Sequence, residues 1–179
     1  RIFVNSALIA VAEFLGIAAV FLLQGAWPVP DVNEPYYLGK AAHYWNPTWC
    51  SRDDFFNTQD AHQVFYFTYG WVTRFLSLPA AAWLGRIITW LLLAEVLRRL
   101  ARALGMTGPP LVFAVILFAA LQDRCAMAGE WVIGGVEAKG FSYVFVFLAL
   151  ARLAQGRWPS TLILLGIATA FHVLVGGWS

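Results

Sequence analysis

The segment AAAWLGRIITWLLLAEVLRRLARALG, residues 80–105, decides the fold class. Its apolar run approaches the roughly 20 residues that an α-helix needs to cross the ~30 Å hydrocarbon core of a bilayer. Pro79 precedes it and suits the first turn of such a helix. Arg98, Arg99 and Arg102 stand near its end, and the positive-inside rule places that end in the cytoplasm. The segment is therefore predicted to span a membrane and to start at the outer face.

The composition extends this interpretation to the whole chain. Hydrophobic residues make up 60% of the sequence and charged residues 12%, with nine Trp, whereas soluble domains average roughly a quarter charged. Other apolar runs lie at about 3–27, 111–128 and 141–153, and a last one starts near 161. The sequence predicts an all-α fold, a polytopic bundle of about five transmembrane helices in the cell inner (plasma) membrane. We expect residues 1–179 to be a single transmembrane domain and the N-terminal fragment of a longer membrane protein.

A polar segment follows the first apolar run. The stretch DVNEPYYLGKAAHYWNPTWCSRDDFFNTQDAH, residues 31–62, holds five of the ten acidic residues. The orientation set by the arginines places this stretch outside, so residues 28–79 are predicted to form an external loop with short interfacial helices. The aromatic part, 62–78, is placed along the interface because a span there would put the arginine cluster on the wrong side. Its 17 residues leave a membrane span as the alternative.

Ionisable residues within or next to the apolar runs form a second pattern. Each costs about 2.5 to 3.5 kcal/mol on insertion scales, so such residues usually face a bundle interior or a working site. Counting depth along the helices places several near the outer surface: Arg86, Asp123, Arg124, Glu137, Lys139 and His172. We expect these residues to form the floor of a polar site that the acidic loop covers. Structural ion pairs and snorkelling side chains are the alternative for the arginines, and a hydrogen-bonded core position is the alternative for the histidine.

Glu34 and Asp31 are the candidate catalytic carboxylates of the loop. Asn33 followed by Glu34 and a proline predicts the start of a helix, with Glu34 at its positive end. There Glu34 can serve as an ionised general base, or it can simply stabilise the helix. Asp31, just outside the first span, is the rival base. His62 is a further candidate for substrate binding, and it can share a hydrogen bond with Asp60.

Several classes of site are disfavoured because their motifs do not occur. The sequence has no zinc-ligand spacing, nucleophile elbow, P-loop or dinucleotide fingerprint. A basic patch suited to nucleic acid is also missing. We expect no resident metal or cofactor, although a divalent metal could share the stabilisation of a phosphate leaving group.

The order of these features resembles the GT-C superfamily of integral-membrane glycosyltransferases. The shared features are an anchor helix, carboxylates in the outer loop after it, interfacial helices, and a span that starts at Pro79, contains Arg86 and ends in RRLARALG. The resemblance implies that Asp31 or Glu34 is the catalytic base, and that Arg86 and Lys139 hold the phosphate of a polyprenyl-linked sugar. The two carboxylates are three residues apart, which departs from the adjacent acidic pair of that superfamily.

Three local blocks carry a second resemblance. NEPYYLGKAAHYWNP (33–47), DAHQVFYFTYGWVTRF (60–75) and GEWVIGGVEAKGF (129–141) resemble the signature blocks of an uncharacterised family of bacterial polytopic membrane proteins. This family implies a polytopic membrane fold and brings no established activity.

The predicted function is inverting transfer of a sugar from a polyprenyl-phosphate donor at the outer membrane face, with membrane lipids as partners. The alternatives are a transporter or flippase with an outward-facing polar cavity, and a non-catalytic scaffold subunit if the charges are merely paired. Cys50 and Cys125 both fall on the outer side of this layout, so a disulfide between them is a further expectation.

Overall fold

The computed structural model describes residues 2–31, 33–59, 61–125 and 131–179 of the chain, and the regular structure in these ranges is helical, without a strand. The all-α prediction is therefore confirmed. The elements are α1 (Ile2–Gly25), α2 (Glu34–Trp45), α3 (Gln63–Thr68), the 3-10 helix η1 (Gly70–Arg74), α4 (Leu78–Ala103), α5 (Pro109–Cys125), α6 (Ala138–Ala154), α7 (Trp158–Phe171) and α8 (Val173–Trp178).

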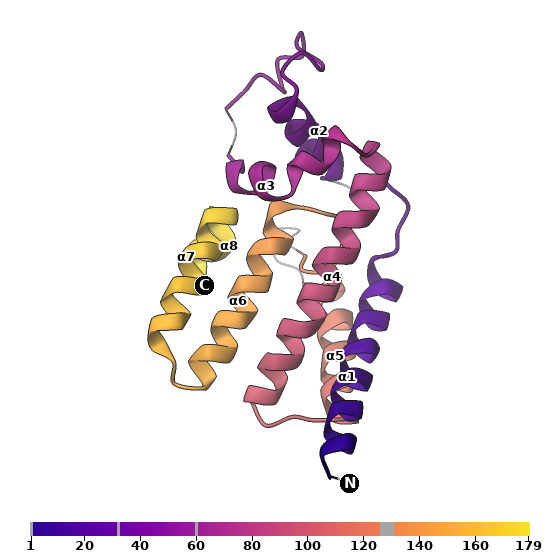
Figure 1. Cartoon of the computed structure of the whole chain (residues 1–179), viewed down its shortest axis with the longest axis vertical. Helices are drawn as coiled ribbons and strands as arrows, with labels where there is room; N and C mark the ends of the chain where they lie inside the picture. The colour runs from indigo at the N-terminus through magenta and orange to yellow at the C-terminus, as the bar shows by residue number, and fades with distance from the viewer. Residues whose placement is uncertain (1, 32, 60, 126–130) are drawn as a thin grey trace.

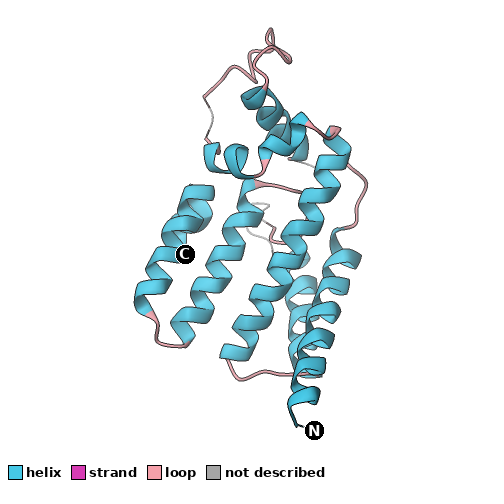
Figure 2. Ribbon diagram, viewed as in Figure 1, coloured by secondary structure: helices cyan, strands magenta, loops and turns pink. Residues whose placement is uncertain are grey.

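The longer helices stand side by side, and α2, α3 and η1 cover the end of the bundle that is uppermost in Figures 1 and 2. Helix α4 lies at the centre of this bundle, where it packs against α1, α5 and α6. The Ser77 hydroxyl oxygen accepts a hydrogen bond from the Ala80 backbone N–H and caps the start of α4. Gly105, with φ of 85°, follows its end.

The core of the bundle consists of apolar side chains that recur on one side of α4. Trp90, Leu93 and Leu97 are at most 8% exposed and pack with Ile17 of α1 and Leu111 of α5. Their spacing of three and four residues is that of a helix with one apolar stripe. This stripe fixes how α4 is turned within the bundle, and with it the direction of the polar side chains on the same helix.

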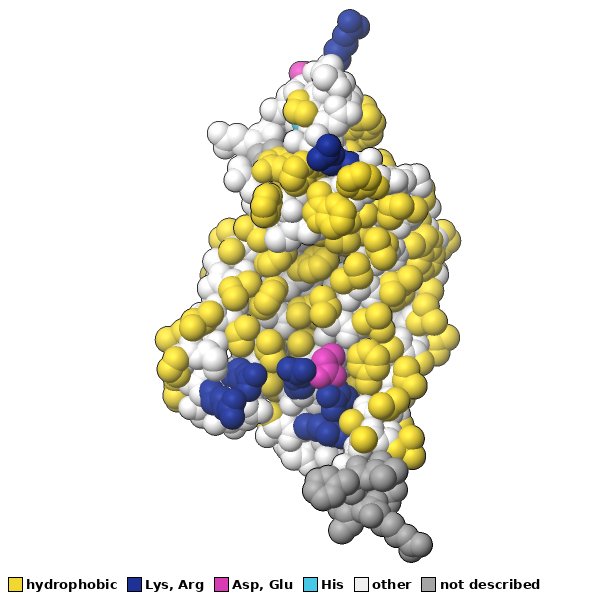
Figure 3. Space-filling model, in the orientation of Figure 1, with side chains coloured by type: hydrophobic (Ala, Val, Ile, Leu, Met, Phe, Trp, Pro, Cys, Tyr) yellow, Lys and Arg dark blue, Asp and Glu magenta, His cyan; other side chains and the backbone are white. Residues whose placement is uncertain are grey.

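The outward faces of these helices are also apolar. Leu23 of α1 is 87% exposed and Leu162 of α7 is 67% exposed, and Figure 3 shows hydrophobic side chains over most of the visible middle of the molecule. Two segments, Ser6–Gly25 and Leu78–Ala103, are long and apolar enough to cross a membrane, whereas α5 and α7 contribute shorter apolar helices. An exposed apolar surface of this kind favours membrane association.

The last apolar run departs from the expectation of one continuous helix that carries His172 in its middle. Helix α7 ends at Phe171, His172 adopts an extended backbone, and α8 then packs back against α7. Gly176 permits this close approach, because a Cβ on it would clash with the Thr169 backbone. The expected continuous helix is therefore wrong.

The segment between α1 and α4, called the covering segment below, carries the short helices α2, α3 and η1. Helix α2 begins at Glu34 with Asn33 at the N-cap position, as the sequence predicted, although the Asn33 side chain makes no capping bond to the described part of the chain. Helices α3 and η1 are six and five residues long. Neither is long enough to cross a bilayer. The aromatic residues of this segment form a second core with the start of α4 and with α6, which includes Tyr37, Phe65 and Tyr69.

Candidate functional site

A buried ion pair between Glu34 and Arg86 lies where α2 meets α4. The Arg86 Nε donates to Glu34 Oε1 and the Arg86 Nη2 donates to Glu34 Oε2, each at 2.7 Å. The two residues are 1% and 0% exposed, respectively. Two parallel hydrogen bonds between a guanidinium and a carboxylate are the strongest common form of this contact. The structure thus brings together two of the residues that the sequence singled out.

The same pair also binds backbone groups of two other segments, the one between α1 and α2 and the one before α6. The Glu34 carboxylate accepts hydrogen bonds from the Asp31 N–H at 2.8 Å and from the Val136 N–H at 2.9 Å. The Arg86 Nη1 donates to the Trp27 carbonyl. One ion pair therefore joins the segment after α1, the start of α2, the third turn of α4 and the loop before α6.

These contacts determine the charge state of Glu34. Burial acts to raise the pKa of this carboxyl, but the hydrogen bonds from Arg86 and from two backbone N–H groups outweigh it and hold the pKa below its usual value. Each carboxylate oxygen accepts two hydrogen bonds. A carboxylate whose lone pairs are committed in this way is poorly suited to accept a proton from a substrate. The geometry favours a structural role for Glu34.

Asp31, the rival carboxylate, is half-buried beside this pair. Its Oδ2 accepts a hydrogen bond from the Gly135 N–H at 3.1 Å. The loop reaches this position because residue 135 has no side chain: a Cβ there would lie 2.9 Å from Glu34 Cγ and 3.0 Å from Asp31 Cβ. Asp31 is thus held in place by the backbone and is more accessible than Glu34.

Lys139 and Glu137 lie at the start of α6, next to that loop. The Lys139 Nζ is 3.3 Å from Glu137 Oε2 and 3.6 Å from the centroid of the Trp131 ring. Both charged residues are almost completely buried. Lys139 therefore has an acidic and an aromatic neighbour, which is an arrangement that stabilises a buried cation.

His62 and His172 meet although they are distant in the sequence. Their rings stack with centroids 5.2 Å apart and planes at 10° to one another. The Tyr37 hydroxyl is 3.5 Å from His62 Nε2, and His172 Nδ1 accepts a hydrogen bond from the Val175 N–H at 3.3 Å. Burial lowers the pKa of His62, and the Phe171 backbone opposes this effect only in part.

The remaining predictions concern the charged residues Arg124, Asp123 and Asp60 and the two cysteines. Arg124 is exposed on the last turn of α5. The side chain of Asp123, and Asp60 as a partner of His62, lie outside the described residues. Cys50 and Cys125 are both free and exposed, so the expected disulfide is wrong. Among the described residues, no group of three or more His, Cys, Asp or Glu side chains is arranged to hold a metal ion.

An apolar groove adjoins the buried pair at this end of the molecule. It has a volume of about 280 Å³ and runs between the segment after α1 and the first turns of α4. Its lining residues are Val29, Pro30, Glu34, Pro35, Leu38, Leu78, Pro79 and Ala82. We refer to it as the outer apolar groove, after the orientation that the sequence predicts for this end of the bundle.

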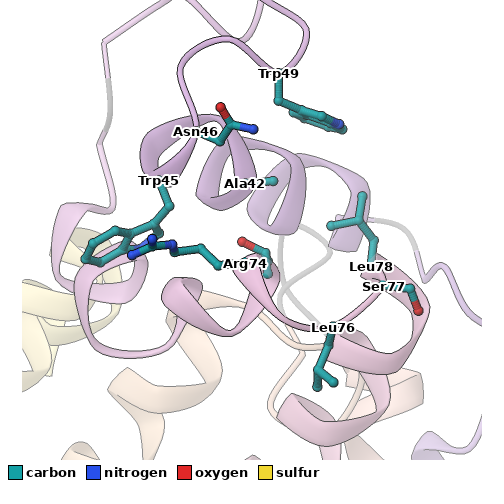
Figure 4. A pocket seen from close by; sticks show the side chains of 9 residues that line it. Ala42, Trp45, Asn46, Trp49, Arg74, Leu76, Ser77 and Leu78 are labelled. Carbon is teal, nitrogen blue, oxygen red and sulfur yellow. The ribbon is translucent and has the colours of Figure 1, made fainter.

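A second groove, about 550 Å³, lies between α2, η1 and the start of α4 and shares Leu78 with the first. Figure 4 shows its side chains, with Arg74 reaching alongside Trp45 and with Asn46 and Trp49 above. The Arg74 Cζ is 5.8 Å from the centroid of the Trp45 ring. We refer to it as the tryptophan groove.

Sequence reasoning missed the tryptophan groove and the role of Lys40. The buried Lys40 Nζ donates to the Thr58 carbonyl and hydroxyl oxygens, each at 2.7 Å, and so fastens the loop after α2. A lysine within a largely aromatic and apolar helix was the available signal. For the groove, the available signal was the pair Trp45 and Trp49 around Asn46, Pro47 and Thr48, whereas Arg74 stands 25 residues later in the chain.

Comparison of the chain with models of protein families, with curated proteins and with solved structures found no match.

Proposed function

We propose that this chain belongs to a polytopic protein of the plasma membrane that transfers a sugar from a polyprenyl-phosphate-linked donor at the outer face, as in the GT-C superfamily. In this reaction a carboxylate takes the proton of an acceptor hydroxyl. The acceptor oxygen bonds to the anomeric carbon while the bond from that carbon to the phosphate oxygen breaks, and the polyprenyl phosphate leaves with the electron pair.

The observation that carries the proposal is the outer apolar groove, whose lining includes the acidic residue Glu34. It lies against the start of α4, a helix long enough to cross a membrane. A groove of this kind suits an isoprenoid chain, and Asp31 follows directly after its lining residue Pro30. The tryptophan groove adjoins it at Leu78 and offers the exposed Arg74 to a phosphate and indole rings to a sugar.

The geometry divides the two candidate carboxylates between two roles. Asp31 is the better candidate for the base, since it is half-buried and positioned by the Gly135 N–H. Glu34 and Arg86 are positioning residues, because their mutual bonds and the backbone groups around them occupy both side chains. Binding of the donor phosphate by Arg86 or Lys139 requires that the substrate replace their present partners.

A transfer assay with the chain in proteoliposomes tests the proposal. Radiolabelled polyprenyl-phosphate sugars would be supplied as a panel, and the release of polyprenyl phosphate would be measured. Loss of a general base should reduce the rate by about 10²-fold or more in Asp31→Asn. Asp54→Asn, at an exposed aspartate of the same covering segment, is the matched control and should keep the wild-type rate. Full activity of Asp31→Asn, or no release from any donor by the wild type, would contradict the proposal.

A scaffold role is the second candidate, and a specific observation favours it. The buried charges that suggested a working site are paired with one another: Glu34 with Arg86, and Glu137 with Lys139. Such pairs can lock segments together without any substrate. A wild-type chain that is stably folded in the membrane but releases no product would favour this role over transfer.

A further inference from the structure

The opposite end of the bundle contains a cavity lined by four arginines. It lies between the last turns of α4 and α6 and has a volume of about 310 Å³. Figure 3 shows basic side chains gathered at the lower end of the molecule, below the apolar surface. The lining residues are Arg98, Arg99, Arg102, Ala103, Leu148, Ala151, Arg152 and Gln155. We refer to this cavity as the arginine pocket.

The carboxylates that bind these arginines do not neutralise the pocket. Glu95 accepts hydrogen bonds from Arg98 and Arg99, at 2.8 Å and 2.6 Å. Glu13 of α1 accepts one from Arg102 at 2.8 Å. Within the described ranges, two carboxylates thus face four guanidinium groups, which leaves an excess of two positive charges around the cavity. The pocket is therefore suited to an anion.

Among the four arginines of the pocket, Arg152 has the charge that is least compensated by the described residues. Its Nη1 donates to the neutral side chain of Gln155 at 3.4 Å, a long hydrogen bond. The other three arginines each bond to a carboxylate. Removal of the Arg152 side chain should therefore disturb an anion site more than it disturbs the fold.

An apolar groove of about 480 Å³ meets the arginine pocket at Arg98, which lines both. This inner apolar groove runs between α1 and α4 and is lined by Ala10, Val11, Phe14, Leu91, Leu92, Glu95 and Arg98. Val11 is 53% exposed, and Leu91 and Leu92 are each 42% exposed. A cationic cavity that continues into an apolar groove on helices of membrane-spanning length has the two-part chemistry of a phospholipid.

We propose that the arginine pocket binds the phosphate of an anionic phospholipid and that one acyl chain lies along the inner apolar groove. The positive-inside rule places this end at the cytoplasmic leaflet. Guanidinium groups of the pocket form charge-assisted hydrogen bonds with the phosphate oxygens. The inference goes beyond the proposed function, and it holds whether or not the opposite end transfers a sugar.

Native mass spectrometry of the detergent-solubilised chain tests the headgroup part of the inference. We expect phosphatidylglycerol to bind at least about tenfold more tightly than phosphatidylcholine, and the loss of one arginine to weaken that binding about fivefold. Arg152→Gln should show this loss. Arg157→Gln is the matched control, because Arg157 is an exposed arginine of the same end that does not line the pocket. Equal affinities for the two lipids, or equal effects of the two variants, would overturn the proposal.

The acyl-chain part is tested by filling the inner apolar groove. Leu92→Trp adds bulk at a lining residue and should weaken phosphatidylglycerol binding several-fold, whereas Leu84→Trp, at an exposed leucine of the same helix outside the groove, should not. Inorganic phosphate serves as the headgroup without chains. If inorganic phosphate displaces phosphatidylglycerol at equal concentration, or if Leu92→Trp binds the lipid as the wild type does, the pocket is a phosphate site and the lipid assignment is wrong.

Discussion

The Arg86 guanidinium holds the Glu34 carboxylate through two hydrogen bonds of 2.7 Å, although 52 residues separate them in the sequence. Both side chains are buried, and the Asp31 and Val136 N–H groups complete the coordination of the carboxylate. The pair therefore fastens the covering segment to the bundle. A general base needs a lone pair that is free to accept a proton. The contacts of Glu34 therefore argue against its assignment as the catalytic base.

Glu34→Gln should be strongly destabilising. The change leaves the Arg86 charge buried without its counter-charge, and breaking a buried ion pair in this way costs about 3 to 5 kcal/mol. Thermal unfolding of the purified chain, followed by circular dichroism, measures the loss. A role for Glu34 only in helix capping predicts a much smaller loss, about 0.3 to 1 kcal/mol.

Glu95→Gln provides the control for this prediction. Glu95 binds Arg98 and Arg99, but its side chain is 29% exposed, so its loss should cost no more than about 1 kcal/mol. The double variant Glu34→Leu/Arg86→Met removes both buried charges and should be more stable than Glu34→Gln. Equal stability of the Glu34 and Glu95 single variants would show that the buried pair is not the main fastening.

The stacked pair of His62 and His172 predicts a pH-dependent stability. The folded chain disfavours protonation of His62 because its pKa is lowered by burial, whereas the unfolded chain takes up the proton below about pH 6.5. The free energy of unfolding should therefore keep its full value above about pH 6.5 and should decrease as the pH drops below that value. The melting temperature measured across this range is the test.

His62→Phe separates this effect from the general response to acid. The phenyl ring keeps an aromatic contact with His172 and cannot be protonated, so the variant should lose less melting temperature than the wild type between about pH 7.5 and pH 5.5. The same loss in both proteins would assign the acid sensitivity to other groups.

Part of the environment of Glu34 could be predicted from the sequence. The Asn-Glu-Pro order predicted the helix start at Glu34, and the burial cost of a charge within an apolar helix predicted that Arg86 would face a polar site. What the sequence could not supply was the Val136 N–H, because that group arrives from a loop about a hundred residues later in the chain. This contact helps to distinguish a catalytic base from a structural residue at position 34. The sequence spacing alone therefore left both roles of Glu34 open.

The reversal at His172 marks another limit of sequence reasoning. Residues on both sides of it are apolar and helical in pattern, so hydropathy predicts one continuous segment. The turn depends on the close packing of Gly176 against the Thr169 backbone. A glycine permits this tertiary contact, but its presence in the sequence does not predict it. Lys40 is similar, since its burial depends on the loop that folds back to bind it.

Gly135→Ala should loosen the contact between the loop before α6 and the two acidic residues. The added Cβ would lie 2.9 Å from Glu34 Cγ and 3.0 Å from Asp31 Cβ, closer than side chains normally approach. Overpacking of this kind costs about 1 to 3 kcal/mol. Gly166→Ala is the matched control, because no atom of the described residues lies within 4 Å of a Cβ in that position of α7, and it should be neutral or stabilising. Equal melting temperatures for the two variants would show that the loop does not need residue 135 to lack a side chain.

The orientation that the proposed function requires of the bundle gives the last prediction, and Cys50 is a natural probe for it. Cys50 is free and exposed in the covering segment, at the end opposite the arginine pocket. If arginines mark the cytoplasmic end, a membrane-impermeant maleimide should label Cys50 in intact cells once Cys125 is replaced by Ser. The matched variant carries Thr107→Cys, an exposed position after α4, with both native cysteines replaced, and it should be labelled only after the cells are opened. Labelling of residue 107 in intact cells would reverse the orientation and place the carboxylates, the tryptophan groove and any transfer reaction on the cytoplasmic side.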